Sequence, residues 1–214
     1  MPRLLSIRMT DVVFFWSDMA RTTLSDIRGI LRGMVQAGTA DYALGTANYW
    51  DDDQLDLVLD RHREDYTHAQ MTPKPIVGVG GTSLWYEYET EVTNIETTSG
   101  GSAIFWVQDG TGATVGTAEY TADYLRGVVE FNTDKGGSVF YWNGRAYDLN
   151  AAAADIWRKK AGYYSTAFNF STDNHKVDRE AIYKHCVEMA ETFEAMSQDS
   201  ISTVQVWRND TDAI

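Results

Sequence analysis

Nucleophilic catalysis is the first chemistry to consider, because the chain has a cysteine, Cys186, directly after a histidine, His185. A nucleophilic thiol requires a base that is held beside it. Neighbouring residues on a helix point about 100° apart, so His185 is poorly placed to activate Cys186. Cys186 also falls on an apolar helical stripe, and we interpret it as a buried structural thiol.

Metal binding is the second chemistry to consider. Asp51, Asp52 and Asp53 could supply oxygen ligands for Mg²⁺ or Ca²⁺. Acidic residues are also favoured in a first helical turn, where free N–H groups and the helix dipole attract negative charge, and we prefer this explanation. The four histidines lack a His-x-x-x-His spacing, so no zinc site is expected. They are His62, His68, His175 and His185.

Paired carboxylates are the third possibility. Glu87, Glu89 and Glu91 alternate along one predicted strand and could in principle hydrolyse a glycosidic bond. We interpret them as a solvated strand face that discourages aggregation. The glycine-rich run 77–81 lacks the Lys-Ser/Thr ending of a phosphate-binding loop. We therefore predict no catalytic, cofactor-binding or metal-binding residue.

Two helices are expected before residue 65. The first covers 22–38, with Thr23 and Asp26 at capping-box spacing and Gly38 as its stop. Its apolar stripe consists of Leu24, Ile27, Leu31, Met34 and Val35. The second covers 49–64, with Asp51 as N-cap and Gln54 at position N3.

After the prolines of "MTPKP" (71–75), β-branched and aromatic residues predict an antiparallel β-domain at 76–147. Asn143-Gly144 is a strong hairpin signal, because a type I′ turn needs positive φ at both central residues. The expected strands are 82–96, 102–108, 125–132 and 137–142, with a turn at 109–112.

The chain then returns to helix, with Asp148 capping a segment that runs to about Phe168. A second helix starts near Asp178, and the two are expected to pack as an antiparallel pair joined by the polar loop 169–177. The basic run 158–160 is interpreted as a solvated helix face. The tail from 199 alternates apolar and polar residues, so it either adds a strand to a partner's sheet or stays unpaired.

Composition narrows the function classes. The formal net charge of −13 disfavours tight binding to nucleic acid. One cysteine cannot form an internal disulfide, and no apolar run reaches the roughly 20 residues of a membrane span. These features predict a soluble protein that folds inside the cell. The apolar run 12–16, "VVFFW", is expected to be buried in this subunit or in a neighbour.

Three segments together resemble the head-to-tail connector, or adaptor, proteins of tailed bacteriophages. They are "LSDIRGILRGMV" (24–35), "WDDDQLDLVLDRHRE" (50–64) and the stretch from "GRAYDLNAAAADIWRKKAGYY" through "FNFSTDNHKVDREAIYKHCVEMAETFE" (144–194). The resemblance covers about 21–66 and 145–197, roughly half of the chain. The intervening β segment and residues 1–20 depart from the minimal four-helix pattern.

The resemblance implies a structural protein of the virion neck, made in the host cytoplasm. It implies a homo-oligomeric ring, typically of 12 copies, that docks beneath the portal protein and receives the next neck or tail protein. Double-stranded DNA would pass through the lumen without sequence-specific binding, and no cofactor, enzymatic activity or membrane partner is implied. A ring needs two complementary side patches on each subunit, which the many aromatic residues could provide.

We therefore expect an α+β protein that is mainly helical, with a four-helix adaptor-like core and an inserted antiparallel β-domain. The expected parts are an N-terminal arm with two helices (1–75), the β-domain (76–147), the helical hairpin (148–198) and a tail (199–214). The residues expected at subunit or portal interfaces are Trp157, Tyr163, Tyr164, Phe168, Ile201, Val204, Val206 and Trp207.

Two other functions stay open. A virion-associated carbohydrate-active enzyme would need two carboxyl groups about 5 to 10 Å apart in a cleft lined by aromatic residues. A ligand-binding module would bind a sugar or a protein through the β-domain residues Trp85, Trp106 and Trp142.

Overall fold

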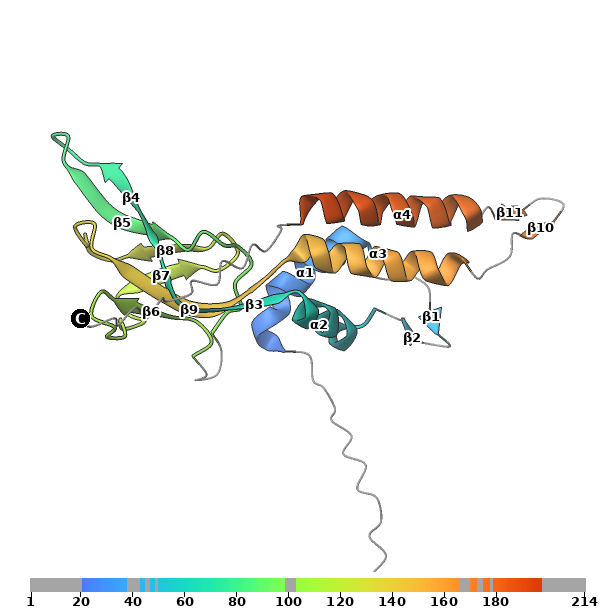
Figure 1. Ribbon diagram of the computed structural model, residues 1–214, viewed down its shortest axis with the longest axis horizontal. Helices are drawn as coiled ribbons and strands as arrows, with labels where there is room; N and C mark the ends of the chain where they lie inside the picture. The colour runs from blue at the N-terminus through green and yellow to red at the C-terminus, as the bar shows by residue number, and fades with distance from the viewer. Residues whose placement is uncertain are drawn as a thin grey trace, which may run out of the picture.

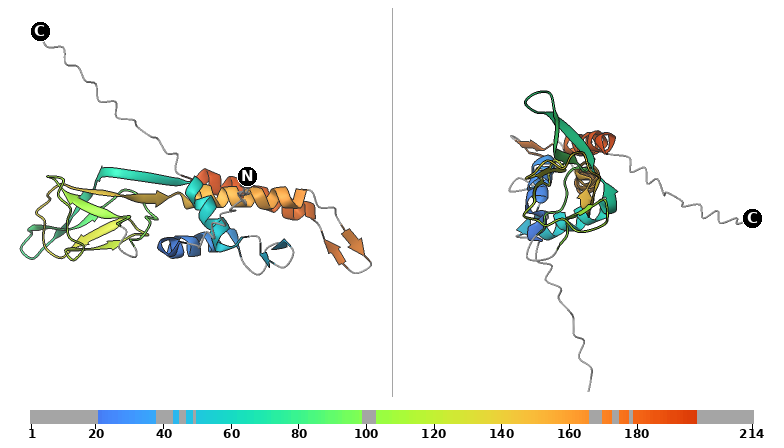
Figure 2. Two further views of the ribbon diagram at one scale, coloured as in Figure 1. Left: turned by 90° about the horizontal axis from the view of Figure 1, so that it is seen from below. Right: turned by 90° about the vertical axis from the view of Figure 1, so that its left-hand side faces the viewer.

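The computed structural model describes residues 21–37, 43–44, 47–48, 50–98, 103–165, 170–172, 175–177 and 179–197. These residues form an elongated molecule with the helices at one end and the larger sheets at the other (Figures 1 and 2). None of the helices described is both long and apolar enough to cross a lipid bilayer.

The helical end is built from two short and two long helices. They are α1 (Ser25–Val35), α2 (Asp52–Arg61), α3 (Leu149–Ser165) and α4 (Arg179–Met196), with a 3-10 turn η1 (Thr22–Leu24) before α1. The predicted stripe of α1 is confirmed, because four of its members are buried and Met34 packs against them. The predicted capping box at its start is wrong, since the Thr23 hydroxyl donates to Glu96 instead.

The start of α2 follows the sequence prediction closely. The Asp51 side chain accepts from the Gln54 backbone N–H at 2.9 Å, and the Gln54 side chain accepts from the Asp51 N–H at 3.3 Å. This reciprocal pairing satisfies two of the free N–H groups that every helix start carries. The aspartate run is therefore explained by capping and by ion pairs of Asp52 with Arg28 and Arg32.

Helices α3 and α4 lie side by side and antiparallel (Figures 1 and 2). Asp148 caps α3 by accepting from the N–H groups of Asn150 and Ala151, at 2.9 and 3.0 Å. Its other oxygen accepts from Ser197 at 2.8 Å, which joins the start of α3 to the end of α4. The connection between the helices is not the polar loop that was predicted, because it contains a small antiparallel pair, β10 (Phe170–Thr172) and β11 (His175–Val177).

Most strands belong to two antiparallel sheets, one ordered β3-β9-β6 and the other β4-β5-β8-β7. Another short pair, β1 (Ala43–Leu44) with β2 (Ala47–Asn48), lies between α1 and α2. The bounds of the larger strands are β3 (Arg63–Gln70), β4 (Thr72–Val77), β5 (Ser83–Glu89), β6 (Trp106–Asp109), β7 (Tyr120–Asp123), β8 (Val128–Phe131) and β9 (Phe140–Tyr147).

The expectation of a mainly helical protein is wrong: the chain has a sheet-rich α+β fold. The strands of the larger sheets begin at Arg63, directly after α2, and not beyond the prolines. Pro73 and Pro75 lie within β4, which pairs only with β5 and is therefore an edge strand, where a missing N–H is tolerated. The helix predicted at 49–64 was therefore too long at its C-terminal end, where Arg63 and Glu64 belong to β3.

The predicted hairpin at Asn143-Gly144 is also wrong, because β9 continues through both residues. Asn143 accepts from the His68 backbone N–H at 2.8 Å, where β3 has a bulge. Gly144 is required by close packing, since a Cβ there would lie 2.9 Å from the Trp142 ring and 3.3 Å from the Phe105 ring. Both residues serve tertiary contacts that a local turn pattern cannot predict.

Two hydrophobic cores follow from this arrangement. The helical core is formed mainly by aliphatic side chains of all four helices, with Trp50, Trp157 and Tyr147. The β core is mainly aromatic and centres on Trp142. Its buried members are Met71, Tyr88, Ile95, Phe105, Val107, Tyr120, Val129, Phe131, Phe140, Trp142 and Ala146.

Candidate functional site

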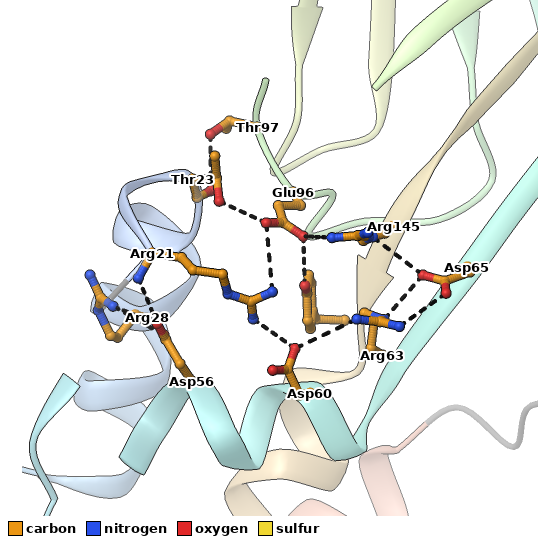
Figure 3. A network of polar contacts seen from close by, with 11 residues as sticks. Arg21, Thr23, Arg28, Asp56, Asp60, Arg63, Asp65, Glu96, Thr97 and Arg145 are labelled. Carbon is orange, nitrogen blue, oxygen red and sulfur yellow. Dashed lines mark hydrogen bonds and ion pairs between the residues drawn. The ribbon is translucent and has the colours of Figure 1, made fainter. Parts of the chain in front are cut away.

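A cluster of charged residues lies where the two cores meet, and we call it the polar seam (Figure 3). At its centre the Glu96 side chain is fully buried. One carboxylate oxygen accepts from the Thr23 hydroxyl at 2.7 Å, and the other accepts from the Tyr147 hydroxyl at 2.7 Å. Arg145 lies 3.6 Å from the same carboxylate. A buried carboxylate needs such donors, because an unpaired buried charge is strongly destabilising.

The backbone holds Glu96 in this position from both sides. Its N–H donates to the Arg145 carbonyl at 2.8 Å, and Ile95 forms a bridge with Ala146 of β9. On the other side the Thr97 hydroxyl donates to the Thr23 carbonyl at 2.9 Å. Segment 95–97 therefore ties the start of the helical part to the central strand of the smaller sheet.

Four further charges continue the seam along its exposed side. Arg21 donates to Asp60 of α2 at 2.6 Å and lies 3.9 Å from Glu96. Arg63 of β3 lies 4.0 Å from Asp60 and 3.1 Å from Asp65. Charges of opposite sign thus alternate from the helices to the sheet.

A buried ion pair lies beneath this chain of charges. Arg28 of α1 donates to both oxygens of Asp56 of α2 at 3.0 Å, and the Arg21 N–H donates to Asp56 at 2.9 Å. Burial raises the pKa of Asp56, while the Arg21 N–H and the Arg28 charge oppose that shift. Arg28 and Asp56 together fix α1 against α2.

The chemistry of the seam favours positioning over catalysis. Burial and the bond to Glu96 raise the pKa of the Tyr147 hydroxyl, which therefore stays protonated and donates. Glu96 lines neither of the two hollows described below. Both oxygens of this carboxylate already accept from protein hydroxyls.

A small cavity of about 110 Å³ lies beside the seam and includes Glu64, Tyr66 and Asp148 in its lining. Glu64 accepts from the Tyr66 hydroxyl at 2.6 Å, and Asp148 caps α3. Ligand pockets usually have about 300 to 1,000 Å³. The cavity is thus small for a sugar ring.

An open groove of about 530 Å³ crosses the β3-β9-β6 sheet. Its apolar lining includes Tyr66, Ile104, Trp106 and Gly144, and its charged lining consists of Asp65 and Arg145, which lie 3.6 Å apart. Of the three tryptophans proposed for ligand binding, Trp106 lines this groove. Trp142 is fully buried in the β core, so a ligand cannot reach its ring.

The predicted interface residues of the helical hairpin differ in how far they are buried. Trp157 is buried in the helical core, and its indole N–H donates to the Met34 carbonyl at 3.4 Å. Tyr164 packs partly against that core, whereas Tyr163 is 40% exposed. Phe168, Ile201, Val204, Val206 and Trp207 lie outside the described residues, as do Gly38 and the run 12–16.

The basic run 158–160 is not simply a solvated face. Lys160 is buried, and its ammonium group donates to the Val35 carbonyl at the end of α1. It also lies 4.8 Å from the centre of the Trp157 ring. Lys159 lies over Trp50, and burial lowers its pKa. Only Arg158, which pairs with Glu194 of α4, meets the prediction of an exposed cation.

Metal-type side chains are not clustered in the part of the chain that the structure describes. His62 pairs with Asp155 at 3.1 Å, and the His68 ring stacks on Tyr141 with centres 3.8 Å apart. Cys186 is buried in the helical core, as predicted for a structural thiol. The ring of the neighbouring His185 lies nearly perpendicular to the Trp157 ring, with their centres 5.8 Å apart.

Exposed apolar side chains occur near both ends of the molecule and also between them, where Leu57 of α2 and Met196 at the end of α4 are 57% and 58% exposed. The far end of the α3–α4 pair carries Tyr163, Ile182 and Tyr183, which are 36 to 40% exposed. We call this group the helical end patch. The tip of the β4–β5 hairpin carries Ile76, Val77 and Val79, the last fully exposed. The helical periodicity of the sequence indicated part of the first group, but no sequence pattern marked the second.

Comparison with models of known protein families, with curated proteins and with solved structures returned no match. The physical features of the chain itself therefore carry the functional conclusion. These features are the elongated shape, the polar seam, the open groove and the apolar groups at both ends.

Proposed function

We propose that this protein is a structural adaptor of a phage virion, whose copies form a ring beneath the portal and join it to the next neck or tail component. The observation that carries the proposal is an elongated molecule with exposed apolar side chains near each end, in addition to the exposed Leu57 and Met196 between them. An adaptor must contact different neighbours at separated surfaces, and exposed apolar groups favour such contacts.

The helical end patch supports one of these contacts. Because α3 and α4 are antiparallel, Tyr163 near the end of α3 lies at the same end of the pair as Ile182 and Tyr183 near the start of α4. Tyrosine is common at protein interfaces, since its ring buries apolar area while its hydroxyl keeps a polar partner. A neighbour that covers this patch would remove three large side chains from water.

The polar seam supports the mechanical part of the proposal. Glu96 joins Thr23 of the helical part to Tyr147 and Arg145 of β9. Directional bonds at a buried position restrict how the two cores can turn relative to each other. An adaptor that transmits a fixed geometry from the portal to the tail benefits from this restriction.

The charge of the chain fits a passage for DNA. The net charge of −13 means that a ring of such subunits repels phosphate overall. Lysine and arginine would instead form salt-dependent contacts with each phosphate and slow the movement of the genome. The proposed lumen would therefore guide DNA without retaining it.

Removal of the protein from the particle tests the proposal. Particles assembled without this chain are expected to have filled heads and free tails that do not join, counted by electron microscopy of purified material. Supplying the full-length chain in the same cells should restore joined particles. Normal numbers of joined particles without the chain would contradict an adaptor role.

The tail prediction has its own test within this proposal. Deletion of 200–214 is expected to leave a folded subunit but to weaken its attachment to the portal. The measurement is the amount of the shortened chain that copurifies with particles, relative to the full chain. Undiminished retention would show that the tail does not engage the portal.

A further inference from the structure

We infer that the tip of the β4–β5 hairpin is a docking element that inserts into the β3-β9-β6 groove of a neighbouring copy of this chain. The inference rests on the proposed assembly of copies and names a surface through which they meet. The inserted surface consists of Ile76, Val77 and Val79. The receiving surface is the groove around Trp106 in the neighbouring copy.

The tip is unusual because it exposes apolar side chains that no other part of the same subunit covers in the described structure. Val79 is fully exposed, Val77 is 79% exposed and Ile76 is 49% exposed. The hairpin extends beyond the rest of the strands, so its tip is surrounded by solvent (Figures 1 and 2). Apolar side chains left in water favour burial against another apolar surface.

The backbone of the tip is well defined despite its exposure. The Gly78 N–H donates to the Thr82 carbonyl at 2.8 Å, and the Gly81 N–H donates to the Gly78 carbonyl at 3.1 Å. Gly80 and Gly81 have φ values of +86° and +80°, which residues with a Cβ rarely adopt. The turn thus presents Val77 and Val79 from a closed loop.

The groove has the properties that such a tip requires. Tyr66, Ile104 and Trp106 provide its apolar walls, and Gly144 contributes to its lining. Its two charged members, Asp65 and Arg145, lie 3.6 Å apart and offset each other. An uncharged hairpin can enter this groove without stranding an unpaired charge.

The positions of tip and groove decide which copy supplies the tip. The tip rises on one side of the β end, whereas β6, which carries Trp106, lies on the opposite side (Figure 1). A hairpin therefore cannot reach the groove of its own subunit. Since the two surfaces differ, the contact is heterologous, and its repetition gives a closed ring when the rotation between copies closes.

Paired cysteines in assembled particles test this contact. Thr67 is exposed at the groove rim, and Val79 is the most exposed tip residue. The native Cys186 is buried, so it does not compete for a short bis-maleimide crosslinker. The variant T67C/V79C is expected to give a ladder of dimers and larger multiples on a denaturing gel.

Single variants reveal the direction of the contact. Particles made from a mixture of T67C and V79C chains should give dimers but no larger multiples, whereas either variant alone should stay monomeric on the gel. The matched control is T67C/V139C, because Val139 is another exposed apolar residue of the β end. Crosslinking of V79C with itself, or a T67C/V79C ladder no stronger than this control, would overturn the inference.

The outcome separates this inference from the proposed function. A chain present in the neck without the Thr67 to Val79 crosslink overturns the hairpin contact and leaves the adaptor role standing. A chain absent from purified particles overturns both.

Discussion

The helical and β ends of this protein bury their apolar residues in different ways. The helical core takes small and aliphatic side chains, among them Ala152, Ala153 and Ile156, from helices that lie close together. The β core instead stacks large rings such as Trp142 and Phe105 between strands that are far apart in the sequence. Between them the connection depends on charged and hydroxyl groups centred on Glu96. Each end is thus stabilised by its own burial, whereas their relative position depends on polar contacts.

Removal of a ring from the β core is expected to have the largest effect. Trp142 is fully buried and stacks on Tyr66 and Phe105, with ring centres 4.8 and 5.8 Å apart. Trp142→Ala should lower the free energy of unfolding by about 3 to 5 kcal/mol, because it leaves a cavity. Urea unfolding followed by near-ultraviolet and far-ultraviolet circular dichroism measures this loss.

Unfolding of W142A should also show that the two ends lose structure separately. Because the helical core is separate, the far-ultraviolet signal of the helices should persist in W142A to higher urea than the near-ultraviolet signal of the β core. The near-ultraviolet signal of Trp50 and Trp157, which lie in the helical core, should persist with it. The partly exposed Trp106→Ala serves as the control and should cost less. Loss of both signals in one transition would contradict separate stabilisation of the two ends.

Removal of the central carboxylate should have the next largest effect. Glu96→Ala leaves the Thr23 and Tyr147 hydroxyls without their acceptor and is expected to cost about 1.5 to 3 kcal/mol. The unfolding transitions of the two ends should also move apart, because Glu96 links them. Glu64→Ala is the control, since Glu64 is exposed and accepts from one hydroxyl. An equal effect of both variants would show that the seam does not couple the ends.

The cap of α2 offers a smaller and local perturbation. Asp51→Ala removes the capping interaction with Gln54 and should lower stability by about 1 kcal/mol. Asp53→Ala, in the same first turn but without a capping role, should cost less. Thermal unfolding compares the two variants, and equal losses would contradict a specific role for the cap.

The smallest expected change, and one of opposite sign, concerns Tyr88. Its hydroxyl is buried and has no hydrogen-bond partner among the described residues, so Tyr88→Phe should be neutral or stabilising by up to about 1 kcal/mol. The same substitution at Tyr147 removes the bond to Glu96 and should destabilise. Chemical unfolding distinguishes them, and a clear loss of stability in Y88F would indicate a partner for that hydroxyl.

The sequence predicted best those features that depend on nearby residues. The stripe of α1, the capping box of Asp51 and Gln54, and the Asp148 cap are all local patterns that the structure confirms. The predicted strands 82–96 and 125–132 contain β5 (Ser83–Glu89) and β8 (Val128–Phe131), because alternation is local as well, but both predictions were too long. Helix ends and strand starts were less accurate, since the Arg63–Gln70 strand is defined by its pairing with β9.

The features that were missed depend on distant partners. Glu96 lies in a polar stretch without any motif, and its partners Thr23 and Tyr147 are 73 and 51 residues away. Lys160 looked like one member of a solvated basic run, but the end of α1 supplies its buried acceptor. Asn143-Gly144 matched a turn pattern, although packing of Trp142 and Phe105 against Gly144 explains the glycine. Such positions become predictable only when the fold is known.

Symmetry-resolved electron cryomicroscopy of the neck in purified particles would decide whether this chain is an adaptor. We expect a ring of copies of this chain beneath the portal, with the α3–α4 pair and the β end contacting different neighbours. A neck without this chain, or an isolated monomer that turns over a polysaccharide, would contradict it.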